Sequence, residues 1–215
     1  YLRKEKSGPR SPGKSVMDVF YYGFDRKSLI DYDILMKLDA DLSFPNHYLQ
    51  DIVSSFQEDT KLGVCGGVCV LQKGDKYIVE NETNLDHVRG ALKSYRRECF
   101  EQIGGLMRIM GWDTVDEHHA RFKKWNICVF PHLKVVHHRS THKEYGLVKA
   151  SFRNGKMLYS IRMDILLVIL NCSKKILKYP YFILSFSMLC GYIYAYFTGY
   201  KYIVGKDLGR FIRIY

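Results

Sequence analysis

The nine residues Met36-Lys-Leu-Asp-Ala-Asp-Leu-Ser-Phe44 carry the strongest indication of the fold, because an apolar run beginning at Ile34 ends there in two carboxylates, Asp39 and Asp41. In α/β proteins, ligands bind at the carboxyl ends of the sheet strands. Mg²⁺ or Mn²⁺ shared with phosphate oxygens typically takes one or two protein carboxylates and fills its other positions with water and substrate. The stretch therefore indicates a nucleotide-diphosphate substrate. From these residues alone, a polar turn that caps the helix after Pro45 is the alternative.

The elements around this stretch alternate between strand and helix. Ile34–Leu38 is expected to be a short buried strand, and a helix is expected after Pro45, because apolar residues recur at helical spacing at Leu49, Ile52, Val53 and Phe56. Another helix should begin near Lys14. Further along, we expect strands at Leu62–Leu71, Lys76–Glu80, Ile127–Phe130 and Leu133–His138, and helices at Ser94–Ile103 and Asp113–Trp125. This alternation predicts an α/β fold.

Composition and charge narrow the class of protein. The 215 residues are 47% hydrophobic, enough for one domain with a core and a smaller appendage. The chain begins without a Met or an apolar leader, so we expect it to be the later part of a longer polypeptide. Six cysteines without a CxxC pair favour a reducing, cytosolic environment. The net charge is +11, of which +8 lies between Ser151 and Tyr215.

The last seventy residues are expected to be helical and to associate with a membrane. Tyr179–Tyr200 contains 22 uncharged residues, which is long enough to span a bilayer. It also contains six tyrosines and is flanked by Lys or Arg on both sides, which fits an interfacial or re-entrant helix pair on anionic lipid at least as well. An ordinary buried helical hairpin is the third possibility.

A second acidic site follows the first by about seventy residues, in the stretch Gly111-Trp-Asp-Thr-Val-Asp-Glu-His-His-Ala120. A carboxylate at Asp116 or Glu117 could deprotonate an acceptor hydroxyl if it lies within hydrogen-bond reach of it. Acids in the first turn of a helix are also common as simple partners of the helix dipole, so this site alone leaves both interpretations open.

Taken together, the acidic pair Asp39 and Asp41, Arg96-Arg97, Gly104-Gly105, the acidic helix and a strand ending in histidine resemble the inverting family 2 glycosyltransferases of the GT-A fold. The resemblance covers about Pro12 to Arg139. It implies a mixed sheet flanked by helices, with residues 1–144 forming the later part of a catalytic domain that lacks its nucleotide-binding front. Residues 145–215 would be a helical, membrane-proximal region like that of bacterial members that build surface polysaccharide.

The resemblance also implies roles for individual residues. Asp39 and Asp41 would hold Mn²⁺ or Mg²⁺ and the diphosphate, Asp116 or Glu117 would be the catalytic base, and the metal could also meet His137 or His138. The basic loop with Arg10 and Lys14 would assist the leaving group. Acceptor or phosphate contacts are expected from Arg96, Arg97 and Trp112, although the two arginines could equally be surface charges, as could any of the histidines.

The implied reaction moves a sugar from a nucleotide-diphosphate sugar, with a UDP-sugar favoured, to a glycan or lipid-linked acceptor at the cytoplasmic face of a membrane. The chain would be peripheral or would carry one C-terminal membrane segment. A degenerate transferase domain that acts as a membrane-associated scaffold is the main alternative. A phosphotransferase is disfavoured by Leu42-Ser43 after the acidic pair, and nucleic-acid binding by basic residues that lie beside apolar helices.

Overall fold

The computed structural model of the chain describes residues 13–26, 31–74, 76–79, 85–138, 146–175 and 182–214. The chain divides into two compact units, Tyr1–Ser140 and Thr141–Tyr215.

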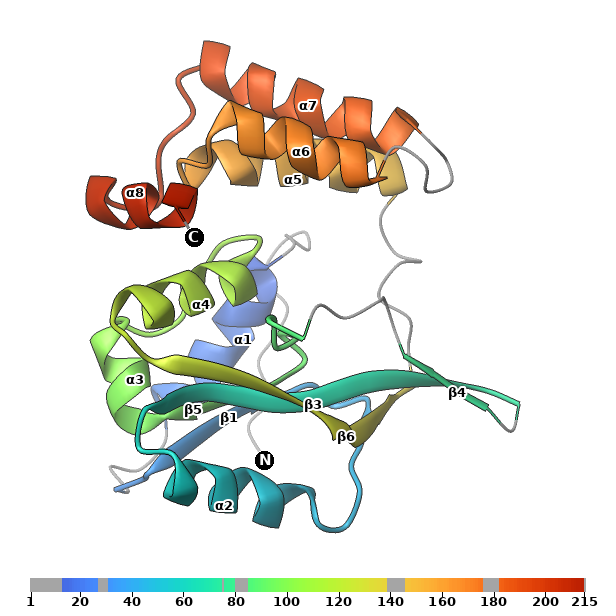
Figure 1. The fold of residues 1–215 in the computed structure, drawn as a ribbon, viewed down its shortest axis with the longest axis vertical. Helices are drawn as coiled ribbons and strands as arrows, with labels where there is room; N and C mark the ends of the chain where they lie inside the picture. The colour runs from blue at the N-terminus through green and yellow to red at the C-terminus, as the bar shows by residue number, and fades with distance from the viewer. Residues whose placement is uncertain are drawn as a thin grey trace. The chain divides into compact units, whose positions relative to one another are not determined.

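Among the described residues, the first unit contains a six-stranded sheet in the order β1-β5-β3-β6-β2, with β4 paired to β3 (Figure 1). The strands are β1 (Ile34–Leu38), β2 (Leu42–Ser43), β3 (Leu62–Lys73), β4 (Lys76–Val79), β5 (Leu92–Arg96) and β6 (Asn126–His137). The β3–β6 pair is parallel and the other pairs are antiparallel, so the sheet is mixed.

Helices cover both faces of this sheet. One face carries α2 (Tyr48–Glu58), and the other carries α1 (Lys14–Phe24), α3 (Arg97–Gln102) and α4 (Trp112–Phe122) (Figure 1). Because both faces are covered, the central strand β3 is buried continuously from Leu62 to Val70 and has an apolar residue or glycine at each of these positions. The predicted fold class, a mixed α/β sheet flanked by helices, is confirmed.

Two sequence-based boundaries were wrong. The predicted helix Ser94–Ile103 begins as a strand, because Ser94 and Tyr95 pair with β1 on one side and β3 on the other before α3 starts at Arg97. The two strands expected around Pro131 form one strand, β6, whose register against β3 shifts between Gly66 and Val68. Proline is tolerated at such an irregularity because no ladder donor is needed there.

Close strand packing explains the glycines of β3. A Cβ atom on Gly67 would lie 2.1 Å from the carbonyl oxygen of Leu133, and one on Gly66 would lie 2.4 Å from that of Leu92. Real Cβ atoms cannot approach backbone oxygens this closely. The absence of a side chain at these two positions therefore lets β5 and β6 lie against β3, which fixes the end of the sheet where the acidic residues are found.

The second unit is helical within its described residues and contains α5 (Leu147–Ser160), α6 (Ile165–Lys175), α7 (Phe182–Phe197) and α8 (Lys206–Ile214). The uncharged segment Tyr179–Tyr200 supplies α7, and its first three residues lie outside the described ranges. No helix in the described part of the chain combines the length and the apolar character needed to cross a bilayer.

Candidate active site

Asp39 lies directly after β1, at the end of the sheet. Its backbone N–H donates to the carbonyl of Ala91 (2.8 Å), which continues the pairing with β5. The buried ammonium of Lys37 forms an ion pair with the Asp39 carboxylate and also donates to the carbonyl of Gly90 (2.7 Å). The Asp39 side chain remains 40% exposed, so one oxygen can still meet a ligand, but its charge is already largely balanced.

Asp41 has a different environment, created by the pairing of β2 with the end of β6. Leu42 lies opposite His137, and the Asp41 carbonyl accepts a hydrogen bond from the N–H of His138 (3.0 Å). This register places the Asp41 carboxylate 3.7 Å from Nε2 of the buried His137. The Asp41 side chain is 31% exposed. It is the carboxylate of the predicted pair that has no lysine partner among the described residues.

The two histidines border a hollow of about 460 Å³, which is also lined by β3 residues up to Gly74. His138 is exposed, and its Nε2 lies 2.7 Å from Oγ of Ser43. The structure therefore places the Asp41 carboxylate beside His137, whereas the His138 side chain contacts Ser43, and a metal site at these residues stays a prediction.

A divalent ion fits these residues only if a ligand completes its coordination. Within the described ranges, no cluster of three or more His, Cys, Asp or Glu side chains is arranged to hold a metal. The Asp41 carboxylate and the His137 imidazole offer two donors, which is the number of protein ligands that Mg²⁺ or Mn²⁺ commonly uses beside substrate phosphates. Asp39 is a weaker candidate because Lys37 already occupies part of its carboxylate.

The predicted bases Asp116 and Glu117 are both 2% exposed and belong to a buried charge network. Nζ of Lys93, which is fully buried, lies 2.9 Å from an oxygen of each carboxylate, and the Tyr95 hydroxyl donates to Asp116. Glu117 also accepts from the N–H of Val88 (2.8 Å) and pairs with His87. Because both carboxylates are buried and already paired, this environment favours a stabilising role for them over the predicted base role.

The pKa values of this pair reflect burial and the shared lysine. Burial raises the pKa of Asp116 to about 6, although Lys93 and the Tyr95 hydrogen bond oppose the shift. Burial also acts to raise the pKa of Glu117, but Lys93 and His87 outweigh it and lower the value to about 2. Lys93 and His87 together thus keep the buried Glu117 ionised.

A third acid of the same helix, Asp113, lies at the surface instead. It is in the first turn of α4, after Gly111, which has a left-handed backbone (φ 75°) and turns the chain into the helix. Its side chain is 31% exposed. A Cβ atom on Gly90 would lie 2.9 Å from Oδ2 of Asp113, and the carbonyl of Gly90 accepts from Lys37, the ion-pair partner of Asp39, so Gly90 lies between Asp113 and the Lys37–Asp39 pair.

The sequence reasoning missed Asp113 although the helical period contained the signal. The buried face of α4 comprises Trp112, Val115, Asp116, Glu117 and Ala120. Position 113 falls outside this face, whereas positions 116 and 117 belong to it. Testing each acid against the apolar period would have separated the solvent-facing carboxylate from the buried ones.

The other predicted site residues do not all reach this end of the sheet. Ile34 pairs with Arg96 and Leu38 with Leu92, so Arg96 lies at the opposite end of β1 from Asp39, about 13 Å along the strand. Arg96 donates to the carbonyls of Phe56, Asp59 and Leu62, and Arg97 pairs with Asp31 and Glu101. Both side chains therefore have other partners, and the phosphate or acceptor contacts predicted for them gain no support from this arrangement.

Trp112 and Lys14 lie closer to the acids. Trp112 is buried, and its ring centroid lies 5.4 Å from Nζ of Lys37 and 5.8 Å from Nζ of Lys93, so it separates the two lysines. Lys14 is exposed at the start of α1, directly after Gly13. A Cβ atom on Gly13 would lie 2.6 Å from Cα of Met110, three residues before Asp113. Arg10 lies outside the described residues.

The fold and these side chains define a class: a mixed α/β domain with three solvent-accessible carboxylates and two histidines at one end of its sheet. No protein-family model matches the chain, and no curated protein matches it. Among solved structures, it is similar to A197 from STIV, with 20% identity over 59% of this chain and a TM-score of 0.38. It is also similar to the mannosyltransferase PcManGT from Pyrobaculum calidifontis, solved with GDP-Man and Mn²⁺, with 14% identity over 96% of this chain and a TM-score of 0.45.

The chain spans 65% of the first protein's length and 59% of the second's, less than two thirds of either.

Proposed function

We propose that the chain is a glycosyltransferase domain of the GT-A type, resembling family 2, that uses a nucleotide-diphosphate sugar. The observation that carries this proposal is the gathering of Asp39, Asp41 and Asp113 at one end of a mixed sheet. Each carboxylate is between 31% and 40% exposed, while the neighbouring Asp116 and Glu117 are sealed in an ion pair. Exposed acids from separate elements at a strand end suit the binding of an ion and a diphosphate.

In this proposal Asp41 and His137 hold Mn²⁺ or Mg²⁺ together with the donor diphosphate. The ion, when bound, would neutralise negative charge on the leaving diphosphate. Lys14, exposed beside the Asp113 segment, would add a second positive charge near the leaving group. Lys37 keeps the Asp39 carboxylate oriented at the end of β1.

Asp113 is proposed as the general base in place of Asp116. It would accept the proton of an acceptor hydroxyl while that oxygen attacks the anomeric carbon from the face opposite the diphosphate, which inverts the configuration. A carboxylate with a side chain that is 31% exposed can meet an acceptor hydroxyl directly, whereas Asp116 would first have to break its contacts with Lys93 and Tyr95. A lipid-linked or glycan acceptor and a location at the cytoplasmic membrane surface, as in polysaccharide biosynthesis, complete the proposal.

The experiment is a thermal-shift titration with UDP, GDP and dTDP, with and without Mn²⁺, followed by a sugar-transfer assay with the matching donor. A ligand that binds only the native state raises the unfolding midpoint. We expect a metal-dependent shift that Asp41→Asn abolishes. Asp51→Asn is the matched control, because Asp51 is similarly exposed (35%) and also lies near a histidine, at 3.8 Å from His47.

Asp113→Asn should keep the nucleotide shift and lose transfer, since the base does not contact the donor diphosphate. A loss on the order of a hundredfold or more is typical for a general base. If no diphosphate raises the midpoint of the wild type, the transferase proposal fails and the scaffold alternative takes its place. If Asp113→Asn transfers normally, the assignment of the base fails.

A further inference from the structure

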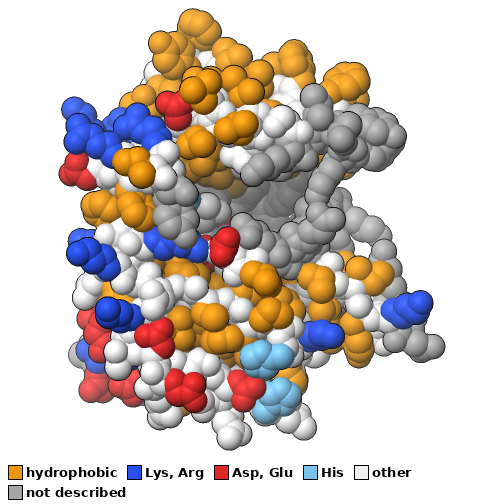
Figure 2. Space-filling model, in the orientation of Figure 1, with side chains coloured by type: hydrophobic (Ala, Val, Ile, Leu, Met, Phe, Trp, Pro, Cys, Tyr) orange, Lys and Arg blue, Asp and Glu red, His pale blue; other side chains and the backbone are white. Residues whose placement is uncertain are grey.

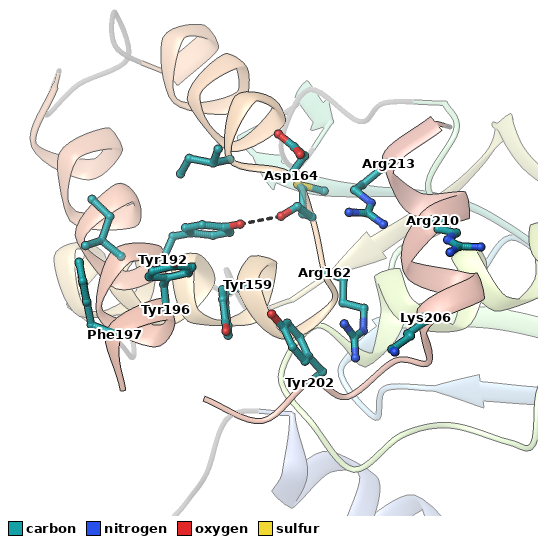
Figure 3. Close-up of a pocket in the computed structure, with 13 residues that line it drawn as sticks. Tyr159, Arg162, Asp164, Tyr192, Tyr196, Phe197, Tyr202, Lys206, Arg210 and Arg213 are labelled. Atoms are coloured by element: carbon teal, nitrogen blue, oxygen red, sulfur yellow. Dashed lines mark hydrogen bonds between the residues drawn. The ribbon is translucent and has the colours of Figure 1, made fainter. Parts of the chain in front are cut away.

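The second unit contains a cavity of about 580 Å³ that the sugar-transfer proposal does not use. Its walls come from the end of α5, the link to α6, the later part of α7 and helix α8 (Figure 3). A cavity of this size is within the range of small-molecule sites. Its lining is divided between aromatic rings and basic groups, and this division indicates what kind of ligand it would take.

The aromatic wall is held in place by contacts within the unit. The rings of Tyr159 and Tyr202 are stacked with centroids 5.1 Å apart, and Tyr159 meets Tyr192 edge-on at 5.5 Å. The Tyr192 hydroxyl donates to the carbonyl of Met163 (2.8 Å), as Figure 3 shows. Rings fixed in this way present a rigid apolar surface and lose little conformational entropy when a ligand binds.

The opposite wall is basic. Lys206, Arg210 and Arg213 follow one another at spacings of four and three residues, which places them on one face of α8. The fourth basic residue that lines the cavity is Arg162, and the single acid is Asp164, so the lining carries a net charge of +3. Asp164 already accepts the N–H of Leu166 (2.9 Å) at the start of α6. Within the described ranges, none of the three α8 side chains forms an ion pair, so this charge remains uncompensated.

Arg162 is fixed in the cavity wall by an unusual backbone. Its φ is 62°, its Nε donates to the carbonyl of Val204 (3.0 Å), and its guanidinium lies 3.7 Å from the centroid of the Tyr202 ring. A non-glycine residue with positive φ carries a conformational cost that its surroundings must offset. The guanidinium is thereby pre-organised beside the aromatic wall, with its terminal nitrogens available to an anion such as phosphate.

The cavity is continuous with an exposed apolar stripe. Ile165, Ile193 and Phe197 line the cavity and are also solvent-exposed, Phe197 by 81%. The stripe continues along α6 and α7 through Leu166, Ile169, Leu170, Phe182 and Phe186. Figure 2 shows hydrophobic side chains in orange over the region of α6 and α7, with basic side chains in blue over α8. A ligand with its anionic group in the cavity can therefore extend an apolar portion onto the stripe.

We propose that this cavity is a binding site for the phosphate headgroup of a membrane lipid. The phosphate lies between Arg162 and the basic face of α8, and the hydrocarbon portion lies on the α6–α7 stripe. The inference deepens the membrane association proposed above, but it requires neither sugar transfer nor the acidic site of the first unit, since every residue involved belongs to the second unit.

The test is co-sedimentation of the full chain with vesicles of phosphatidylcholine alone and with vesicles that also contain phosphatidic acid. The variant is Lys206→Ala/Arg213→Ala, and the matched control is Lys149→Ala/Lys201→Ala, which removes the same charge from exposed positions outside the cavity. We expect wild-type binding only with phosphatidic acid, a loss on the order of tenfold in the cavity variant, and affinity near the wild-type value in the control.

Other outcomes would overturn the proposal in distinguishable ways. Equal losses in both double variants would mean that the anionic surface attracts the whole basic unit and that the cavity is not a site. Equal binding to phosphatidylcholine vesicles would mean that the basic lining does not select an anionic headgroup, and would overturn the proposal. Water-soluble phenyl phosphate provides a separate arm: if it binds and the vesicles do not, the ligand is a soluble phosphate and not a lipid. Binding to neither would remove both the site and the membrane association, and would leave the nucleotide titration unaffected.

Discussion

At the scale of single residues, the most consequential side chain is the buried Lys93, because it is shared by Asp116 and Glu117. Replacing it with Met would leave two buried carboxylates without a cation. We expect Lys93→Met to lower the free energy of unfolding by about 3–5 kcal/mol near neutral pH, measured by urea denaturation. Lys123→Met, at the exposed C-cap of α4, should change the free energy of unfolding by less than about 0.5 kcal/mol.

The destabilisation caused by Lys93→Met should also depend on pH. Without Lys93, the pKa values of both acids rise in the folded state, so the folded chain binds more protons than the unfolded chain as the pH falls toward 5. The destabilisation by Lys93→Met should therefore be smaller at about pH 5 than at about pH 7.5. If Lys93→Met loses the same free energy of unfolding at both pH values, the lysine stabilises the fold through packing alone.

His118 makes a second pH-dependent contribution to stability, and this one is lost as the pH falls. Burial lowers the pKa of His118 to about 4 from its ordinary 6.5, and nearby Arg121 adds to the shift. Stability from a base with a depressed pKa is present above the unfolded value and is lost as the pH falls from 6.5 toward 4. Wild type should lose free energy of unfolding as the pH falls to about 5, and His118→Gln should remove about 2 kcal/mol of that loss. Urea denaturation at both pH values, compared with wild type, separates this contribution from that of Asp116.

At the scale of elements, the packing of α5 against α7 depends on two glycines. A Cβ atom on Gly155 would lie 1.8 Å from the carbonyl oxygen of Met188, and one on Gly191 would lie 2.0 Å from that of Phe152. The two backbones are in direct contact, so any side chain there must force the helices apart. We expect Gly191→Ala to destabilise the second unit by about 2 kcal/mol or more, measured by thermal unfolding.

Gly205→Ala is the control for that prediction, because a Cβ atom there meets nothing within 4 Å and its backbone does not need a glycine. It should leave the unfolding midpoint unchanged or slightly raised, since alanine restricts the unfolded chain. If both variants lower the midpoint equally, close helix packing is not the cause.

The observed helices and strands also show which sequence patterns predicted secondary structure correctly. The helix α2 is confirmed, but its apolar period is confirmed only in part: Ile52 and Phe56 are buried as the spacing predicts, whereas Leu49 and Val53 are exposed. The helix expected from Ser94 was wrong because the first residues of that stretch pair with strands on both sides, and these partners are distant in sequence. A helical period measured along the chain contains no information about such pairing.

At the scale of the whole molecule, each of the two compact units has its own packed core. Chains of this kind commonly depart from a single two-state transition. We expect calorimetry of Gly191→Ala to show a lowered transition for the second unit, with the transition of the first unit near its wild-type temperature. A single transition that moves as a whole would mean that the two units unfold together.

The sequence by itself determined the α/β class, the strand-end position of Asp39 and Asp41, and the mainly helical character of the described part of the second unit. These features follow from local periodicity and from residue chemistry. Only the tertiary structure decided which acids meet solvent: Asp113 is exposed, whereas Asp116 and Glu117 are closed by Lys93, a strand residue 23 positions before Asp116. It also decided that His137 lies beside Asp41, while Arg96 lies at the other end of β1. Burial and ion pairing depend on contacts between elements far apart in the chain, and a one-dimensional pattern does not specify these contacts.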